Sequence, residues 1–209
     1  DDVESRGLGD VYKRQGIPGP YIASKSRQRG TPMRTITALF VGLGSIGTRH
    51  LKNLANLCAD RGWALQADAL RSDLSRPLRD GVAELLHAQY TDMVDVPAHY
   101  DLVFITNPTS LHADALTQVK GRGEALFIEK PIFSAEQTGL ALANYLPTGQ
   151  KAYVAAPMRW CGVMLALKDR LPALHPYCAR VICSSYLPDW RPGVDYRTVY
   201  SAHKALGGG

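Results

Sequence analysis

The sequence predicts an α/β protein: a doubly wound parallel sheet, followed by the start of a second domain. Two observations predict the sheet. Short apolar runs alternate with segments of helical spacing, which is the pattern of βαβ units with right-handed crossovers. In addition, the first apolar run, at 35–41, leads directly into a glycine-rich turn and then into a helical pattern.

The expected elements begin at Met33 and alternate along the chain. Strands are expected over 35–41, 64–70, 102–106, 125–128 and 151–155. Helices are expected over 46–60 (with Gly62 as a stop), 77–86, 112–119 and 135–145. After about residue 157 the pattern changes to a helix over 162–170 and a strand over 177–186. We therefore expect a first domain at 33–155 and the beginning of a second at 156–209.

The turn after the first expected strand reads Gly42-Leu43-Gly44-Ser45-Ile46-Gly47, the G-x-G-x-x-G spacing of a dinucleotide-binding turn. Gly42 lets the chain leave the strand sharply, and Gly44 lets the backbone approach a pyrophosphate closely. Gly47 lets the helix pack closely on the strand. The N–H groups at the start of the helix, at Ser45 and Ile46, then face the phosphates. The alternative is a glycine-rich turn with a structural role only.

The bulk composition is that of a globular chain. Apolar residues make up 45% of the 209 residues and charged residues 21%. No apolar run approaches the roughly 18 residues of a transmembrane helix, and no secretory h-region is present, so we expect no membrane partner. The cysteines form no C-x-x-C pair and no cluster of zinc spacing; we expect reduced thiols, no metal site and a cytoplasmic location. They are Cys58, Cys161, Cys178 and Cys183.

The net charge of +5 raises the possibility of a nucleic-acid partner. Residues 1–32 hold six basic and four acidic side chains, which leaves a charge of only +3 for the rest of the chain. No basic run interleaved with aromatic residues is present. We therefore expect no nucleic-acid partner, since a mildly positive site for an anionic cofactor accounts for the charge as well.

Both ends of the chain look unlike a natural domain. Residues 1–32 are rich in Gly, Pro, Ser and Arg without periodicity, and Asp10–Gln15 resembles the translation of a sequencing adapter. We interpret residues 1–15 as an artefact and Met33 as the true start; the alternative is a natural disordered tail. The chain stops on the glycines 207–209, and we expect it to be a gene fragment.

Three motifs carry a specific resemblance. They are Val-Gly-Leu-Gly-Ser-Ile-Gly-Thr-Arg-His at 41–50, Ile-Thr-Asn-Pro-Thr-Ser-Leu-His at 105–112 and Phe-Ile-Glu-Lys-Pro-Ile at 127–132. In this order and spacing the chain from Met33 to Gly209 resembles the Gfo/Idh/MocA family of NAD(P)-dependent oxidoreductases. The resemblance implies a Rossmann-type domain, then an α+β domain whose antiparallel sheet covers the nicotinamide and often mediates oligomers. It also implies hydride transfer between a nicotinamide and a secondary alcohol of a sugar, a cyclitol or their nucleotide-linked forms.

The resemblance assigns the catalytic role to Lys130, whose amine would relay the hydroxyl proton. Burial beside a positively charged nicotinamide would lower the pKa of that amine; the alternative is a surface lysine. Glu129 would orient Lys130 or contact the cofactor, and Pro131 is a candidate for a cis peptide bond.

Polar residues after the strand ending at Thr106 are further cofactor candidates, because ligands bind beyond the carboxyl ends of parallel strands. They are Asn107, Pro108 and His112. The family commonly has Thr-Pro-Asn here, whereas this chain has Asn-Pro-Thr, so the asparagine and the threonine (Thr109) have exchanged places. For His112, a ligand role and a structural role remain equally open.

The choice between NAD and NADP depends on the end of the second expected strand. An acidic residue there binds a ribose 2′-OH, whereas an arginine receives a 2′-phosphate. Arg71 and Ser72 occupy this place, and Asp68 is expected within the strand. We therefore favour NADP slightly over NAD.

Substrate contacts are expected from Lys130 and from three arginines, of which the last two suit bidentate pairing with a carboxylate or phosphate and the first could also contact the cofactor. They are Arg159, Arg191 and Arg197. The segment at 155–160 departs from the family pattern, and Arg159 could instead stack on Trp160. The alternative for all three is a solvated loop arginine.

In the family, the glycine-rich turn at 207–209 leads into a helix with Asp-x-x-x-His, whose histidine is a catalytic partner of the lysine. We expect this histidine beyond the chain, a fragment without turnover of its own, and a full-length homo-oligomer. The alternatives are a non-catalytic dinucleotide-binding regulator on the same scaffold and a nucleic-acid-binding α/β protein.

Overall fold

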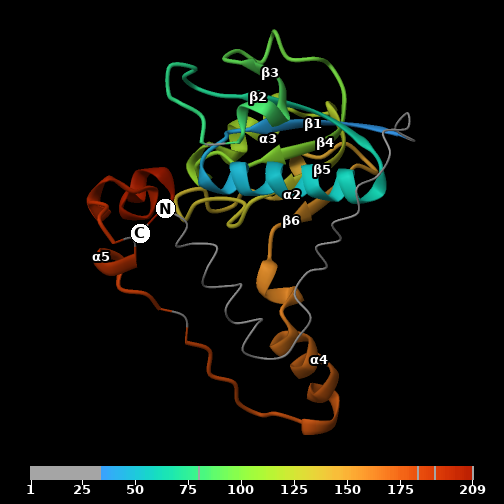
Figure 1. Cartoon of the computed structure of the whole chain (residues 1–209). Coiled ribbons are helices and arrows are strands. Elements are labelled where there is room, and N and C mark those ends of the chain that lie inside the picture. The colour runs from blue at the N-terminus through green and yellow to red at the C-terminus, as the bar shows by residue number, and fades with distance from the viewer. Residues whose placement is uncertain (1–33, 80, 183, 191, 209) are drawn as a thin grey trace. The chain divides into compact units, whose positions relative to one another are not determined.

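The computed structural model describes residues 34–79, 81–182, 184–190 and 192–208, and the expectations for residues 1–32 concern a segment outside these ranges. Six parallel strands form one sheet in the order β3-β2-β1-β4-β5-β6 (Figure 1). The strands are β1 Thr35–Val41, β2 Ala64–Leu70, β3 Leu86–Tyr90, β4 Tyr100–Ile105, β5 Gly123–Ile128 and β6 Lys151–Val154. The strand order reverses between β1 and β4, which is the switch point of a doubly wound fold.

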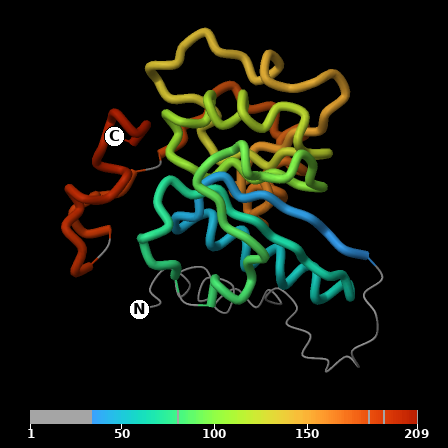
Figure 2. The backbone as a smooth tube through the Cα atoms, turned by 90° about the horizontal axis from the view of Figure 1, so that it is seen from above, coloured from blue at the N-terminus to red at the C-terminus, as the bar shows by residue number. Residues whose placement is uncertain are grey.

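The α-helices are α2 Ser45–Arg61, α3 His112–Gln118, α4 Gly162–Leu174 and the short α5 Leu187–Trp190. Two of them cover the sheet from opposite sides, as the view along the sheet in Figure 2 shows for α2 and α3. Leu51 of α2 packs in a buried cluster with Phe40, whereas Leu116 of α3 packs in a second cluster with Leu39. None of the described helices is long and apolar enough to cross a membrane.

Strand β1 shows why the sheet is buried on both faces. Successive side chains of a strand point to opposite faces, so Ala38 and Phe40 enter one cluster while Leu39 and Val41 enter the other. All four are buried, and the Phe40 ring stacks on Phe104 of β4 with 4.4 Å between centroids. A continuous apolar run is therefore what a central parallel strand requires.

The expected helix over 77–86 is wrong. The chain forms only a 3₁₀ turn at Ala83–Leu85 and then the edge strand β3, which pairs with β2. Gly81 has a φ of 68°, which ends any right-handed helix before the turn.

The expected helix over 135–145 is also wrong, because only a 3₁₀ turn at Leu142–Asn144 forms. Gly139, with a φ of 90°, interrupts the segment. In the second half of the chain, residues 177–182 and 184–186 form no strand, contrary to expectation. A strand needs a neighbour for its backbone hydrogen bonds, and none of the described strands lies beside this segment.

Candidate nucleotide-binding and catalytic site

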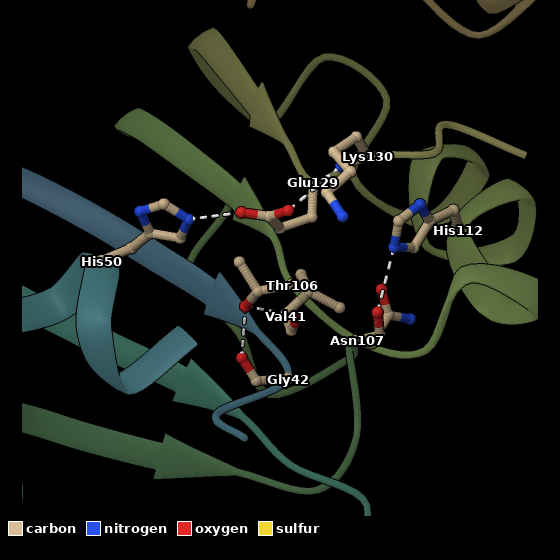
Figure 3. Close-up of polar contacts among 8 residues, drawn as sticks. All are labelled: Val41, Gly42, His50, Thr106, Asn107, His112, Glu129 and Lys130. Carbon is tan, nitrogen blue, oxygen red and sulfur yellow. Dashed lines mark hydrogen bonds and ion pairs between the residues drawn. The ribbon is translucent and has the colours of Figure 1, made fainter. Parts of the chain in front are cut away.

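The predicted motifs meet at one edge of the sheet. Gly42 follows β1, Thr106 follows β4 and Glu129 follows β5, so all three lie at the carboxyl ends of neighbouring strands beside the switch point. Figure 3 shows Gly42, Thr106 and Glu129 around a common region. Ligands of doubly wound sheets bind at this position.

Two glycines of the turn are required by packing. Gly42 has a φ of 85°, and a Cβ there would lie 2.7 Å from the backbone of Asn107. A Cβ at Gly47 would lie 2.6 Å from the carbonyl oxygen of Gly42 and 2.8 Å from Oγ1 of Thr106. The turn and the first turn of α2 are therefore packed against each other at backbone distance.

The third glycine differs, because it faces open space. A Cβ at Gly44 would meet no atom within 4 Å. Gly44 precedes α2, whose first turn has no side-chain cap and no acidic residue. The first N–H groups of a helix have no partner within it, so those at Ser45 and Ile46 are open to an acceptor from outside the helix. An open approach to uncapped helix N–H groups fits a phosphate group. The residues present thus fit the pyrophosphate of a dinucleotide.

Thr106 is buried, and its hydroxyl holds the turn in place. Oγ1 donates to the carbonyl oxygen of Gly42 at 2.5 Å, with a second contact to the carbonyl oxygen of Val41 at 3.3 Å (Figure 3). The backbone N–H of Thr106 also donates to Val41 at 3.0 Å. Its contacts in the structure are therefore with the turn, which suits a residue that shapes the cofactor loop.

Asn107 and Pro108 form the turn between β4 and α3. The amide nitrogen of Asn107 donates to the carbonyl oxygen of Leu111 at 3.3 Å, whereas its Oδ1 is buried and accepts no hydrogen bond from the described residues. A buried carbonyl oxygen without a donor is the kind of group that a ligand hydroxyl can satisfy. The family commonly has a threonine at the position of Asn107. In this chain the threonine is Thr109, and its hydroxyl lies 2.6 Å from the hydroxyl of Tyr200.

His112 is fully buried and bridges two loops. One ring nitrogen lies 3.0 Å from the carbonyl oxygen of Asn107, and the other lies 3.0 Å from the carbonyl oxygen of Ile132. Burial lowers the pKa of His112, although both carbonyl oxygens and the charge of Glu129 act in the opposite direction. These contacts favour the structural role of His112 that the sequence left open.

The lowered pKa of His112 predicts a pH dependence of stability. In the unfolded chain His112 becomes protonated below about pH 6.5, whereas in the folded chain its lowered pKa keeps it neutral to a lower pH. Protons therefore bind preferentially to the unfolded chain, and the free energy of unfolding should fall as the pH drops through this range. We expect His112→Gln to reduce the slope of the free energy of unfolding against pH. One proton contributes at most about 1.4 kcal/mol per pH unit to this slope. Urea unfolding between pH 5 and 8 measures it, with His203→Gln, at an exposed histidine, as the control. Equal slopes for the His112 variant and the unaltered chain would contradict the prediction.

Glu129 uses both carboxylate oxygens. Oε1 lies 2.6 Å from Nε2 of His50, and Oε2 accepts from the backbone N–H of Lys130 at 3.1 Å (Figure 3). The side chains of Glu129 and His50 are only 12% and 17% exposed. Sequence reasoning missed His50, although it ends the first motif at 41–50.

Lys130 follows Glu129 at the edge of β5, and its side chain is exposed. In Figure 3 its amine lies between Glu129 and His112, above the turn at Thr106 and Asn107. The peptide bond between Lys130 and Pro131 is cis, as the resemblance implies. The structure thus brings the lysine to the same edge as the glycine-rich turn.

Arg71 follows β2, and its guanidinium donates hydrogen bonds to two neighbouring residues. Nη1 donates to Oε1 of Gln89 at 2.7 Å, and Nη2 donates to the carbonyl oxygen of Arg76 at 2.5 Å. The neighbouring Ser72 is exposed. Asp68 lies within β2 as expected, and it is buried against the hydroxyl of Tyr100 at 2.7 Å.

The predicted substrate arginines are exposed where the structure describes them, and each has local surroundings of its own. Arg159 is exposed in the 3₁₀ turn Pro157–Trp160, and the indole N–H of Trp160 donates to Tyr153. Arg197 is exposed and pairs with Asp195 at 3.6 Å. Arg191 lies outside the described residues.

A switch-point sheet whose glycine-rich turn leaves backbone N–H groups open defines a dinucleotide-binding Rossmann domain. Comparison with known proteins agrees: the profile of the Gfo/Idh/MocA oxidoreductases, described as an oxidoreductase family with an NAD-binding Rossmann fold, matches residues 36–154. The chain belongs to this family.

Relatives include the scyllo-inositol 2-dehydrogenase (NAD(+)) of Bacillus subtilis, 27% identical over 64% of this chain and 39% of the relative. Among solved structures, the WlbA dehydrogenase of Chromobacterium violaceum, crystallised with NADH and UDP-GlcNAcA, is 25% identical with a TM-score of 0.53, over 67% of this chain and 40% of that one. The apo scyllo-inositol dehydrogenase of Lactobacillus casei has the same identity and TM-score, over 67% and 42%. This chain therefore spans less than half the length of these relatives.

Proposed function

We propose that this chain binds a nicotinamide dinucleotide at the switch point and serves hydride transfer to or from a secondary alcohol. One observation carries the proposal: the open glycine-rich turn and the loop of Glu129 and Lys130 lie at the same edge of the sheet. When bound, the nicotinamide supplies the hydride acceptor or donor. The residues proposed to hold the dinucleotide are Gly42, Gly44, Ser45, Ile46, Gly47, Thr106, Asn107 and Pro108.

Lys130 is proposed as the proton-transfer residue. Oxidation of an alcohol releases the hydroxyl proton as well as a hydride, so a group with a free electron pair must lie beside the hydroxyl. The amine of Lys130 lies at the sheet edge where the nicotinamide end of the cofactor is expected, and Glu129 holds the backbone of Lys130 through one hydrogen bond. The lysine would take the proton in oxidation and return it in reduction.

The substrate class follows from the relatives and remains part of the proposal. One relative is named for scyllo-inositol, and one solved structure holds UDP-GlcNAcA. We therefore propose a sugar, a cyclitol or a nucleotide-linked sugar as the substrate. Residues 156–209 are proposed to belong to a second domain; in support, α4 has no buried residue in the described structure.

Arg71 is proposed to decide the nicotinamide cofactor through a 2′-phosphate, which favours NADP. Its fixed guanidinium lies at the end of β2, where the adenosine ribose is expected. We expect Arg71→Ala to weaken NADPH binding by about tenfold or more, since hydrogen bonds to charged groups contribute about 1.5–3 kcal/mol, while NADH binding changes little. Fluorescence titration measures both, with the exposed Arg76→Ala as the matched control. The same loss for both cofactors would contradict this role.

The test of the proposed function is a titration of the full chain with NADH and with NADPH, followed by nicotinamide fluorescence. Saturable binding that weakens in Gly44→Ala is the expected result. If a sample that circular dichroism shows to be folded binds neither cofactor, the proposed function is overturned.

A further inference from the structure

His50 has no part in the function proposed so far, yet it makes a close contact with the loop of Lys130. It lies on α2, one turn after Gly47. We propose that His50 is a positioning residue: it holds the carboxylate of Glu129 so that this carboxylate fixes the backbone amide of Lys130. The consequence for proton transfer rests on the proposed function, whereas the positioning itself does not.

The contact chain is continuous from the helix to the lysine. Nε2 of His50 lies 2.6 Å from Oε1 of Glu129, and Oε2 of the same carboxylate accepts from the N–H of Lys130 at 3.1 Å. The N–H of Glu129 also donates to the carbonyl oxygen of Ile105 at 2.9 Å, so the backbone on this side is fixed by the sheet. Because both carboxylate oxygens are engaged, Glu129 is better suited to hold Lys130 than to contact a ligand.

The surroundings of His50 keep this pair out of water. The imidazole packs edge-on against Phe127, with 4.9 Å between centroids, and lies 6.2 Å from the ring of Phe104. A charge-assisted hydrogen bond is stronger where water is excluded. The ring orientation is therefore set by packing, and the hydrogen bond to Glu129 follows from it.

The loop is held on its other side as well. His112 contacts the carbonyl oxygen of Ile132, two residues after Lys130. Lys130 and Pro131 thus lie between two points that are fixed by histidines on α2 and α3. Figure 3 shows the contact of His50 with Glu129 on one side. Because α2 also begins at the glycine-rich turn and is packed against it through Gly47, the same helix that would receive the phosphates holds the lysine loop.

The experiment compares His50→Gln with His50→Asn in the full, isotope-labelled chain. A glutamine amide nitrogen reaches the position of Nε2, whereas the shorter asparagine stops at the position of Nδ1. We expect hydrogen exchange at the Lys130 amide, followed by NMR, to accelerate about tenfold or more in His50→Asn. We expect His50→Gln to restore the exchange of the unaltered chain.

A matched control uses another histidine–glutamate pair among the described residues. His99 lies 3.3 Å from Glu124, and both side chains are well exposed. We expect His99→Asn to leave exchange at Lys130 unchanged. Melting temperatures for every variant separate a local effect from general loosening, and His50→Leu, which fills the aromatic pocket, serves if His50→Asn does not fold.

Unchanged exchange at Lys130 in a folded His50→Asn or His50→Leu overturns the positioning role, as does failure of His50→Gln to restore it. Titration of the same samples with NADH and with NADPH is read separately. If neither cofactor binds, the proposed function fails while the exchange result on His50 still stands. If either cofactor binds and the exchange does not respond, only the positioning role fails.

Discussion

Replacing Gly42 with alanine is expected to lower the free energy of unfolding by about 2–5 kcal/mol. Two costs combine: a left-handed conformation costs an alanine about 1–2 kcal/mol, and overpacking costs about 1–3 kcal/mol. Both apply here, because Gly42 has a φ of 85° and a Cβ would lie 2.7 Å from the backbone of Asn107. Backbone atoms cannot move aside as the end of a flexible side chain can. Urea unfolding followed by circular dichroism measures the loss.

Gly44→Ala is the matched control two residues away. No atom lies within 4 Å of its added Cβ, and the only expected cost is that of alanine in place of glycine at the N-cap of α2, so we expect the free energy of unfolding to fall by no more than about 1 kcal/mol. If a pyrophosphate approaches this backbone, the same methyl group occupies its place, and NADH binding should weaken about tenfold or more. A large loss of stability in Gly44→Ala, or none in Gly42→Ala, would show that the turn is packed differently.

The first βαβ unit could be predicted because its signals are local. The apolar run of β1, the glycine spacing and the helical stripe adjoin one another, and β1 and β2 have the bounds that were expected. The end of α2 was equally readable, because Gly62 follows the helix with a φ of 69°.

Three elements were misread, and two of them, the helices expected over 77–86 and 135–145, failed for different reasons. Strand β3 reads Leu-His-Ala-Gln-Tyr, and only its pairing with β2 at the edge of the sheet makes it a strand. The segment at 135–145 has enough helix-forming residues to suggest a helix, yet Gly139 and the turn at Leu142–Asn144 direct it otherwise. Tertiary pairing overrides weak local propensity in the first case, and a glycine in the left-handed conformation interrupts the helix in the second.

The same contrast between local signals and long-range contacts holds for the candidate site. The glycine-rich turn and the Glu129–Lys130 motif are each a continuous stretch of the chain, so both motifs were identified from the sequence. The pairing of His50 with Glu129 joins residues 79 positions apart, so no local pattern indicates it. His112 was recognised, and the two carbonyl oxygens beside its ring, which favour a structural role, come from loops that the sequence does not show to be adjacent.

Lys130→Met is expected to lower kcat by about 10²–10⁴-fold while NADH binds as before, because the variant lacks only the proton-transfer group. Methionine keeps the length of the side chain without the amine. Lys130 is exposed, and the contact that holds its loop is made by its backbone N–H, so the substitution leaves Glu129 and His50 paired. Because we expect this chain alone to lack turnover, the rate is measured as NADH formation with scyllo-inositol as the probe substrate in a longer, turnover-competent form of the protein that carries the same substitution. Fluorescence titration of the chain itself measures the binding.

The control for Lys130→Met is Lys151→Met. Lys151 is an exposed lysine at the start of β6, opposite Ala125 at the amino-terminal side of the sheet and away from the glycine-rich turn. Its substitution changes the net charge equally but removes no group from the proposed site, so kcat should not change. Lys130→Met that keeps more than about a tenth of the kcat of the unaltered protein would exclude the amine as the proton carrier. Loss of NADH binding together with kcat would instead assign Lys130 to cofactor binding, since a purely catalytic group leaves binding intact.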